Sequence, residues 1–264
     1  MKTKLLLITL LGACGIATAG EFAEKTVTYE IGDTVFESTM VWESENGDPR
    51  PGILMVPNWM GPTEASLEKA RKVAAYGYVV MMVDMYGVGV RPKDASEAGK
   101  AAGAVRADRA MMRNRAAKAL AVFRSTDGIP LQADKVAAIG FCFGGGTVLE
   151  MARGGADVDA VISFHGDLMS PTLESDAANT TAKVLVLHGA EDPYVPQEHV
   201  QAFVGAMLQT DADWQLVQFS GTVHSFTDSL ADSPGFADFN PVSAARAFQY
   251  MEELLEELWN KKKK

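Results

Sequence analysis

The hydrophobic positions of the chain fall into short apolar runs separated by longer segments with a helical pattern. Short continuous apolar runs are typical of strands that are buried on both faces of a parallel sheet. The segments predicted as strands are 52–56, 78–83, 135–141, 158–164, 183–187 and 214–219. The segments predicted as helices are 64–76, 96–123, 147–153, 196–208 and 241–259. This alternation predicts an α/β protein whose mostly parallel sheet is covered by helices on both faces.

The N-terminal part of the folded region has a different pattern. Residues 27–31 and 35–42 are predicted strands joined at Gly32-Asp33, which is a hairpin signal. We therefore expect antiparallel strands at one edge of the sheet. The sequence contains no internal repeat, low-complexity linker or break in composition. Residues 20–264 are accordingly predicted to form a single domain.

The first 19 residues have the pattern of a secretory signal peptide. Lys2 and Lys4 form a positive start, and 5–11 is an apolar run too short to span a bilayer. The segment 17–19 (Ala-Thr-Ala) supplies the small residues of a cleavage site before Gly20. We expect a signal peptide over 1–19, export to the bacterial periplasm, and no membrane span.

The chain has two cysteines, Cys14 and Cys142. The segment 11–14 (Leu-Gly-Ala-Cys) resembles a bacterial lipobox, so the alternative to a soluble exported protein is a lipoprotein anchored through Cys14. In either case Cys142 has no disulfide partner in an oxidising compartment. An unpaired thiol in that compartment is a liability unless the protein buries it or uses it.

Composition and charge exclude several classes of function. The 24 basic and 34 acidic residues give a formal net charge of −10, which repels nucleic acid and anionic lipid. The histidines show no metal-ligand spacing, and the cysteines are too few for a thiolate zinc site. We therefore expect a small-molecule partner, no nucleic-acid partner, no metal and no cofactor.

The most informative segment is the glycine-rich turn around Cys142. Gly140, Cys142 and Gly144 form a G-x-C-x-G pattern between a predicted strand and a predicted helix. In a nucleophile elbow the flanking positions must be small because the backbones approach closely there. The N-terminus of the following helix also favours thiolate over thiol. The alternative is a buried structural cysteine beside a glycine-rich turn.

Two later loops supply partners for a nucleophile. Asp192 follows the predicted strand 183–187, and His224 follows the strand 214–219. The chain order nucleophile, acid, histidine is that of α/β-hydrolases, and all three lie beyond carboxyl ends of strands, where open α/β sheets bind ligands. Cys142 is the predicted nucleophile, His224 the base and Asp192 the residue that orients it.

An oxyanion hole needs two backbone N–H groups. One is expected from Phe143, the residue after the nucleophile. The second is expected from the loop after strand 52–56, where Pro57 has no N–H and the choice is Asn58, Trp59 or Met60.

With these motifs the sequence, from about residue 27 to 259, resembles the dienelactone hydrolase family. That family is a branch of the α/β-hydrolases that uses a cysteine nucleophile. The resemblance is most specific at 140–145 (Gly-Phe-Cys-Phe-Gly-Gly), 189–192 (Gly-Ala-Glu-Asp), 224–226 (His-Ser-Phe) and 84–86 (Asp-Met-Tyr). It implies an α/β-hydrolase fold without a separate lid and a Cys142-Asp192-His224 triad. It also implies Trp59 as the second oxyanion donor.

The sequence departs from the family pattern around the substrate. Asn58 stands where the family has a glutamate, and Val88 and Asp228 stand where it has carboxylate-binding arginines; Arg91 is the nearest basic residue. An acid in place of an arginine favours a neutral or cationic ester, lactone or thioester. The residues expected at the substrate pocket are Asn58, Tyr86, His165 and Asp228, although His165 also fits a buried, hydrogen-bonded histidine.

The leading function is hydrolysis of carboxylic esters or lactones through a thioacyl-enzyme. Acyl or peptide transfer to an amine would use the same triad. A non-catalytic binding protein that has kept the fold is the third interpretation, because a fold does not guarantee its chemistry.

Overall fold

The computed structural model describes residues 21–44 and 47–259, so the expected signal peptide over 1–19 and Cys14 lie outside the described residues. The main strands are β1 Phe22–Ile31, β2 Thr34–Glu43, β3 Arg50–Val56, β4 Val79–Met82, β5 Leu131–Phe141, β6 Ala160–Phe164, β7 Lys183–Gly189 and β8 Trp214–Phe219. The main helices are α1 Glu64–Ala74, α2 Ala95–Ala107, α3 Arg109–Ser125, α4 Phe143–Arg153, α6 Gln197–Met207 and α7 Pro241–Trp259. Short elements are α5 Leu173–Asp176, η1 Ala177–Asn179, β9 Asp232–Ser233 and β10 Ala237–Asp238.

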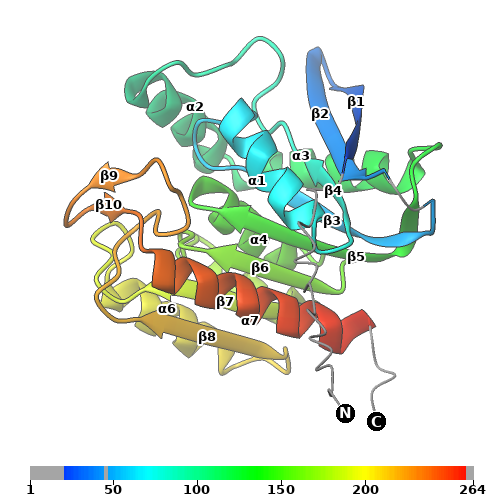
Figure 1. Ribbon diagram of the computed structural model, residues 1–264. Helices are drawn as coiled ribbons and strands as arrows, with labels where there is room; N and C mark the ends of the chain where they lie inside the picture. Colours follow the sequence, from blue (N-terminus) through cyan, green and yellow to red (C-terminus); the bar gives the residue numbers. More distant parts are fainter. Residues whose placement is uncertain (1–20, 45–46, 260–264) are drawn as a thin grey trace, which may run out of the picture.

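Eight strands form one sheet in the order β1-β2-β4-β3-β5-β6-β7-β8 (Figure 1). All neighbours from β4 to β8 pair in parallel, whereas β2 is antiparallel to both β1 and β4. Gly32 turns the β1–β2 hairpin with a φ of +57°, a conformation that favours glycine. The predicted mostly parallel sheet with antiparallel strands at one edge is therefore confirmed.

Two apolar cores lie on opposite faces of the sheet because successive side chains of a strand point to opposite sides. On β3, Ile53 and Met55 belong to the core formed with α1 and α7. Leu54 and Val56 belong to the core formed with α2, α3, α4 and α6. Both faces of the central strands are thus buried, which explains their continuous apolar runs in the sequence.

Two helices differ from the sequence prediction. The predicted helix over 96–123 is broken at Asp108, which ends α2 and caps α3 by accepting a hydrogen bond from the Met111 N–H at 2.8 Å. An alanine-rich stretch has high helix propensity throughout, so a single capping aspartate was a weak signal. The helix after the elbow begins at Phe143 rather than Thr147, because the glycines 144–146 belong to its first turn.

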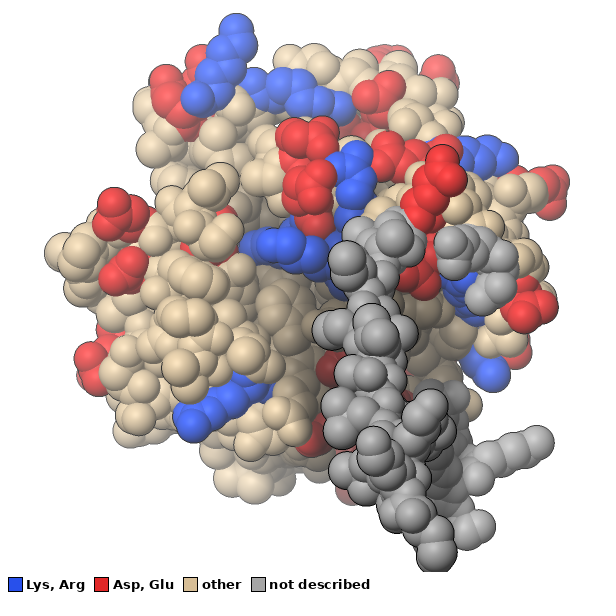
Figure 2. Space-filling view, in the orientation of Figure 1, with Lys and Arg blue, Asp and Glu red and all other residues tan. Residues whose placement is uncertain are grey.

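The surface carries charges of both signs close together, and the face drawn in Figure 2 shows them interspersed. On α1, for example, Arg71 pairs with Glu24, Glu64 and Glu68. Among the helices of residues 21–44 and 47–259, none combines the length and apolar character needed to cross a bilayer.

Candidate active site

Cys142 lies in the sharp turn between β5 and α4. Its backbone has φ 53° and ψ −113°, a conformation that side-chain-bearing residues rarely adopt. A Cβ atom at Gly140 would collide with the backbone of Gly144, and one at Gly144 would collide with the backbone of Val56. The turn therefore requires glycine two residues before and two residues after Cys142, as the sequence pattern predicts.

Asp192 and His224 lie together on the loops that follow β7 and β8. Asp192 Oδ2 and His224 Nδ1 are 2.7 Å apart, and the Asp192 side chain has no exposed surface. The other oxygen, Oδ1, accepts hydrogen bonds from the N–H groups of Tyr194 at 2.8 Å and Val195 at 3.2 Å. These bonds hold the carboxylate still, so the orientation of the imidazole is fixed as well.

His224 and Cys142 interact, and each group shifts the pKa of the other. Burial raises the pKa of Cys142, but hydrogen bonding and charge from His224, the charge of Arg106 and the Phe143 N–H outweigh it, so the net shift is downward. Burial lowers the pKa of His224, but Asp192 and Cys142 raise it to about 10. Both shifts favour a thiolate–imidazolium pair over a neutral thiol and imidazole.

The rings around His224 limit its movement. Tyr194 and His165 both contact it edge to face, with ring centroids 5.2 and 5.1 Å away. Its backbone is tied to the segment 236–238, because its N–H donates to the Phe236 carbonyl and its carbonyl accepts from the Asp238 N–H. The histidine loop is therefore supported by the short β9–β10 hairpin.

The loop after β3 lies beside the elbow and contains the expected second oxyanion donor. The Met60 N–H already donates to Asn58 Oδ1 at 3.0 Å. The Trp59 carbonyl accepts a hydrogen bond from the Tyr86 hydroxyl at 2.8 Å, and the Tyr86 ring packs against Phe143 with centroids 5.5 Å apart. Of the three N–H groups that the sequence left open, that of Met60 is thus occupied, while Tyr86 holds the Trp59 peptide in place.

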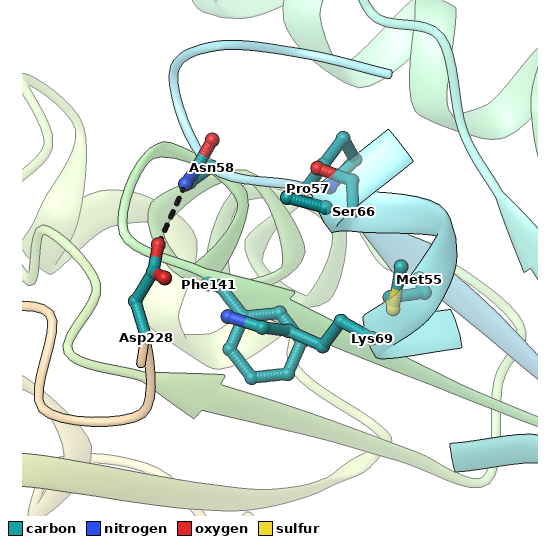
Figure 3. A pocket seen from close by; sticks show the side chains of 8 residues that line it. Met55, Pro57, Asn58, Ser66, Lys69, Phe141 and Asp228 are labelled. Carbon is teal, nitrogen blue, oxygen red and sulfur yellow. Dashed lines mark hydrogen bonds between the residues drawn. The ribbon is translucent and has the colours of Figure 1, made fainter. Parts of the chain in front are cut away.

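A small cavity of about 20 Å³, partly open to solvent, adjoins the elbow (Figure 3). Asn58 and Asp228, which the sequence analysis placed at the substrate, both line it, and Asn58 Nδ2 donates to Asp228 Oδ2 at 3.4 Å. Lys69 of α1 lies over the Phe141 ring with its Nζ 4.4 Å from the ring centre. Burial lowers the pKa of Lys69, whereas the nearby charges of Asp228 and Cys142 act in the opposite direction.

Lys69 and Arg106 are two cations near the thiol that the sequence analysis missed. The Arg106 guanidinium lies 5.5 Å from the centre of the Phe143 ring. Lys69 stands three residues after Ser66 and four before Val73, which are buried residues of α1. That spacing was a usable signal that Lys69 borders the inner face of its helix. Arg106 carried no comparable signal.

The remaining expected residues have local roles. Arg91 forms an ion pair with buried Asp84 at 2.9 Å and donates to the Gly87 carbonyl, so it is held on the Asp84 loop. His165 is 2% exposed; its Nδ1 accepts from the Cys142 N–H at 3.1 Å and its Nε2 lies 2.8 Å from Thr227 Oγ1. His165 is thus the buried, hydrogen-bonded histidine of the two interpretations considered for it.

No group of three or more histidine, cysteine or acidic side chains in the described part of the chain is arranged to hold a metal ion. The polar groups at the site are a thiol, an imidazole, a carboxylate and backbone N–H groups, which are groups that acyl-transfer chemistry uses.

The sheet topology, the sharp strand-to-helix turn at Cys142 and the loop positions of Asp192 and His224 beyond β7 and β8 define an α/β-hydrolase. The sequence model of the dienelactone hydrolase family matches residues 38–259, and the chain belongs to that family.

Individual relatives agree with this assignment. A dienelactone hydrolase-like promiscuous phosphotriesterase from metagenomic libraries is 35% identical, with a TM-score of 0.83, and the match covers 90% of this chain and 99% of the other. A protein of Bradyrhizobium sp. described as a probable 2-oxo-3-(5-oxofuran-2-ylidene)propanoate lactonase is 26% identical over 75% of this chain and 80% of its own. The Pyrococcus horikoshii acylaminoacyl peptidase shares only the fold, with 14% identity, a TM-score of 0.70, and coverage of 92% of this chain and 43% of the other. The protein is thus a dienelactone hydrolase-like hydrolase of esters or lactones.

Proposed function

We propose that the protein hydrolyses neutral carboxylic esters or lactones with Cys142 as nucleophile, His224 as acid and base, and Asp192 as the residue that orients His224. The observation that carries the proposal is the strained turn that holds Cys142 in interaction with His224, whose Nδ1 contacts a buried carboxylate at 2.7 Å. A structural cysteine would need neither the strain nor the two partners.

The acylation step follows from this arrangement. The Cys142 thiolate attacks the carbonyl carbon, and the carbonyl oxygen becomes an oxyanion that accepts hydrogen bonds from the N–H groups of Phe143 and Trp59. As the tetrahedral intermediate collapses, the bond to the leaving oxygen breaks. His224 Nε2 gives its proton to that oxygen, so an alcohol departs and a thioester on Cys142 remains.

Deacylation uses the same groups in reverse. Neutral His224 takes a proton from a water molecule, whose oxygen attacks the thioester carbon. Collapse of the second intermediate breaks the carbon–sulfur bond, releases the carboxylic acid and restores the thiolate–imidazolium pair. Asp192 stays ionised throughout and stabilises the imidazolium.

The charge of the substrate is proposed from the pocket next to the elbow. Asp228 replaces a carboxylate-binding arginine of the family and lies near Lys69, so the pocket has no net excess of positive charge of the kind that selects an anion. Arg91 is committed to Asp84. We therefore expect neutral esters to be better substrates than carboxylate-bearing lactones.

The decisive experiment measures turnover of small neutral and anionic p-nitrophenyl esters and lactones by wild type and Cys142→Ala. The alanine variant should lose about 10⁴-fold or more in kcat while keeping its fold, because members of a catalytic triad act as a unit. Near-wild-type turnover by purified C142A would refute the nucleophile assignment. Addition of an amine nucleophile tests acyl transfer, because a transferase would form amide at the expense of acid.

The place of action is a separate part of the proposal. We propose that the segment 1–19 exports the chain to the periplasm of a bacterium, with lipidation of Cys14 as the alternative. Fractionation of expressing cells, with Cys14→Ala as the matched variant, distinguishes the two. A change from membrane to soluble fraction in C14A indicates the lipoprotein, whereas a soluble periplasmic wild type indicates cleavage before Gly20.

A further inference from the structure

His165 is a buried histidine next to the proposed triad that takes no part in the acyl-transfer steps. It follows β6 and has a φ of +42°, which is unusual for a residue with a side chain. Both ring nitrogens contact protein atoms: Nδ1 lies 3.1 Å from the backbone N–H of Cys142, which it shares as a donor with the Phe164 carbonyl at 3.0 Å, and Nε2 contacts Thr227 Oγ1 at 2.8 Å. The ring therefore joins the nucleophile turn to the loop that carries His224.

The hydrogen-bond pattern fixes the protonation of this ring. A backbone N–H can only donate, so Nδ1 must be the nitrogen with a free lone pair. Nε2 then carries the proton and donates a hydrogen bond to the Thr227 hydroxyl oxygen. Burial lowers the pKa of His165 well below its usual value, and the nearby charges of His224, Lys69 and His188 act in the same direction. These contacts and the lowered pKa favour a neutral His165 imidazole with its proton on Nε2.

The backbone around this ring is strained on both sides. In the described part of the chain, the non-glycine residues with positive φ are Cys142, His165 and Ser225. Cys142 lies in the turn after β5, Ser225 lies in the loop that carries His224, and His165 contacts both segments. Such conformations persist only where surrounding contacts hold them. The His165 ring supplies such contacts, since it also packs edge to face on the rings of His224 and Phe226.

We propose that His165 and Thr227 form a neutral hydrogen-bonded bridge that positions His224 against the Cys142 thiol. The inference rests on the proposed function, because it concerns the alignment of two groups that function assigns to catalysis. His165 touches no reacting atom in this scheme, so it is a positioning residue. Small displacements of catalytic groups reduce rates strongly, which is why such a bridge matters.

The test compares Thr227→Val with Thr227→Ser. Valine has the shape of threonine but cannot accept a hydrogen bond from His165 Nε2, whereas serine keeps the hydroxyl. We expect T227V to lower kcat about tenfold or more with little change in KM, and T227S to stay within about threefold of wild type. The pH at which iodoacetamide alkylates the thiol half-maximally should rise in T227V, because His224 stabilises the thiolate less well, and should not rise in T227S.

A role in folding alone would lower the melting temperature of T227V and leave kcat and the alkylation profile as in wild type, and that result overturns the proposal. If T227V does not fold, His165→Asn replaces it: asparagine tolerates positive φ and keeps an acceptor for the Cys142 N–H but does not reach Thr227. H165N with wild-type kcat and alkylation profile likewise overturns the proposal. C142A, assayed in parallel, separates the two hypotheses, since its activity depends on the proposed function and not on the bridge.

Discussion

Helix α4 begins and ends beside a cluster of buried ionisable groups, and the two clusters behave differently. At its start Cys142 faces His224, which contacts Asp192. Near its end Glu150 accepts hydrogen bonds from Arg113 at 2.8 Å and from Arg153 at 2.9 Å, and its side chain has no exposed surface. Both clusters compensate the cost of burying charge by pairing opposite charges.

The difference lies in which groups are able to exchange a proton. An arginine keeps its proton at any physiological pH, so the Glu150 cluster has one charge state and serves as a rigid brace. Burial raises the pKa of Glu150, but Arg153, a hydrogen bond from Ser170 and Arg113 together outweigh it and keep the carboxylate ionised. Cysteine and histidine lose their protons at lower pH than arginine does, so Cys142 and His224 form a cluster that is able to exchange a proton. The comparison teaches that burial of charge marks function only when the partners are titratable.

The largest expected effect comes from removing a member of the cluster formed by Cys142, His224 and Asp192. His224→Ala should reduce kcat nearly as much as C142A, by about 10³-fold or more. Asp192→Asn should cost less, because the imidazole remains although its orientation is lost. Single-turnover and steady-state rates on a neutral p-nitrophenyl ester measure both. A greater loss in D192N than in H224A would contradict the assigned roles.

The second prediction concerns removal of the carboxylate from the Glu150 cluster. Glu150→Gln leaves Arg153, which is 3% exposed, without its buried counter-charge, so the free energy of unfolding should fall by about 3–5 kcal/mol. Asp157→Asn is the matched control, because it removes an ion pair with Arg124 in which the aspartate side chain is 93% exposed, and should cost about 1 kcal/mol or less. Urea denaturation measures both. E150Q that remains folded at the assay temperature should keep its kcat, and a kcat loss comparable to that of H224A would remove the distinction between the clusters.

A third prediction follows from the pKa shifts of Cys142 and His224. The lowered pKa of the thiol means that its alkylation by iodoacetamide should reach half-maximal rate at a pH below the value of 9.0 typical of a free cysteine. The raised pKa of His224, about 10, means that the imidazolium persists across the neutral range and that ester hydrolysis should fall as the pH approaches that value. In His224→Gln the alkylation midpoint should move upward, because the cation that stabilises the thiolate is gone. An unshifted midpoint in H224Q would show that the pair is not coupled.

The smallest expected effect concerns the pocket beside the titratable cluster. Asp228→Asn removes a negative charge near Lys69, so kcat/KM for a carboxylate-bearing ester should rise by about tenfold at low salt, while that for a neutral ester changes less. Lys69→Met should act in the opposite direction on the anionic ester. Equal changes for both esters in D228N would show that Asp228 does not select by charge.

Much of the fold was predictable because local patterns and global topology agree. Continuous apolar runs predicted the central parallel strands, and Gly32 marked the antiparallel hairpin. The break between α2 and α3 was missed because the helix propensity of the surrounding residues outweighed one aspartate. The turn at Cys142 was recognisable because its geometry requires glycine at 140 and 144, and both positions lie within two residues of Cys142 in the sequence.

The sequence alone predicted the α/β class and the glycine-flanked turn at Cys142, because each depends on residues that are close together in the chain. Only the tertiary structure decided which groups surround the thiol. Asn58 and Asp228 are 170 residues apart, and His165 and Thr227 are 62 apart, yet each pair is in contact. Lys69 and Arg106 likewise interact with Cys142 from helices that precede it in the chain. Such contacts depend on how α1, α2 and the loops pack around the sheet, and packing depends on the sum of many weak long-range interactions that no single local pattern records.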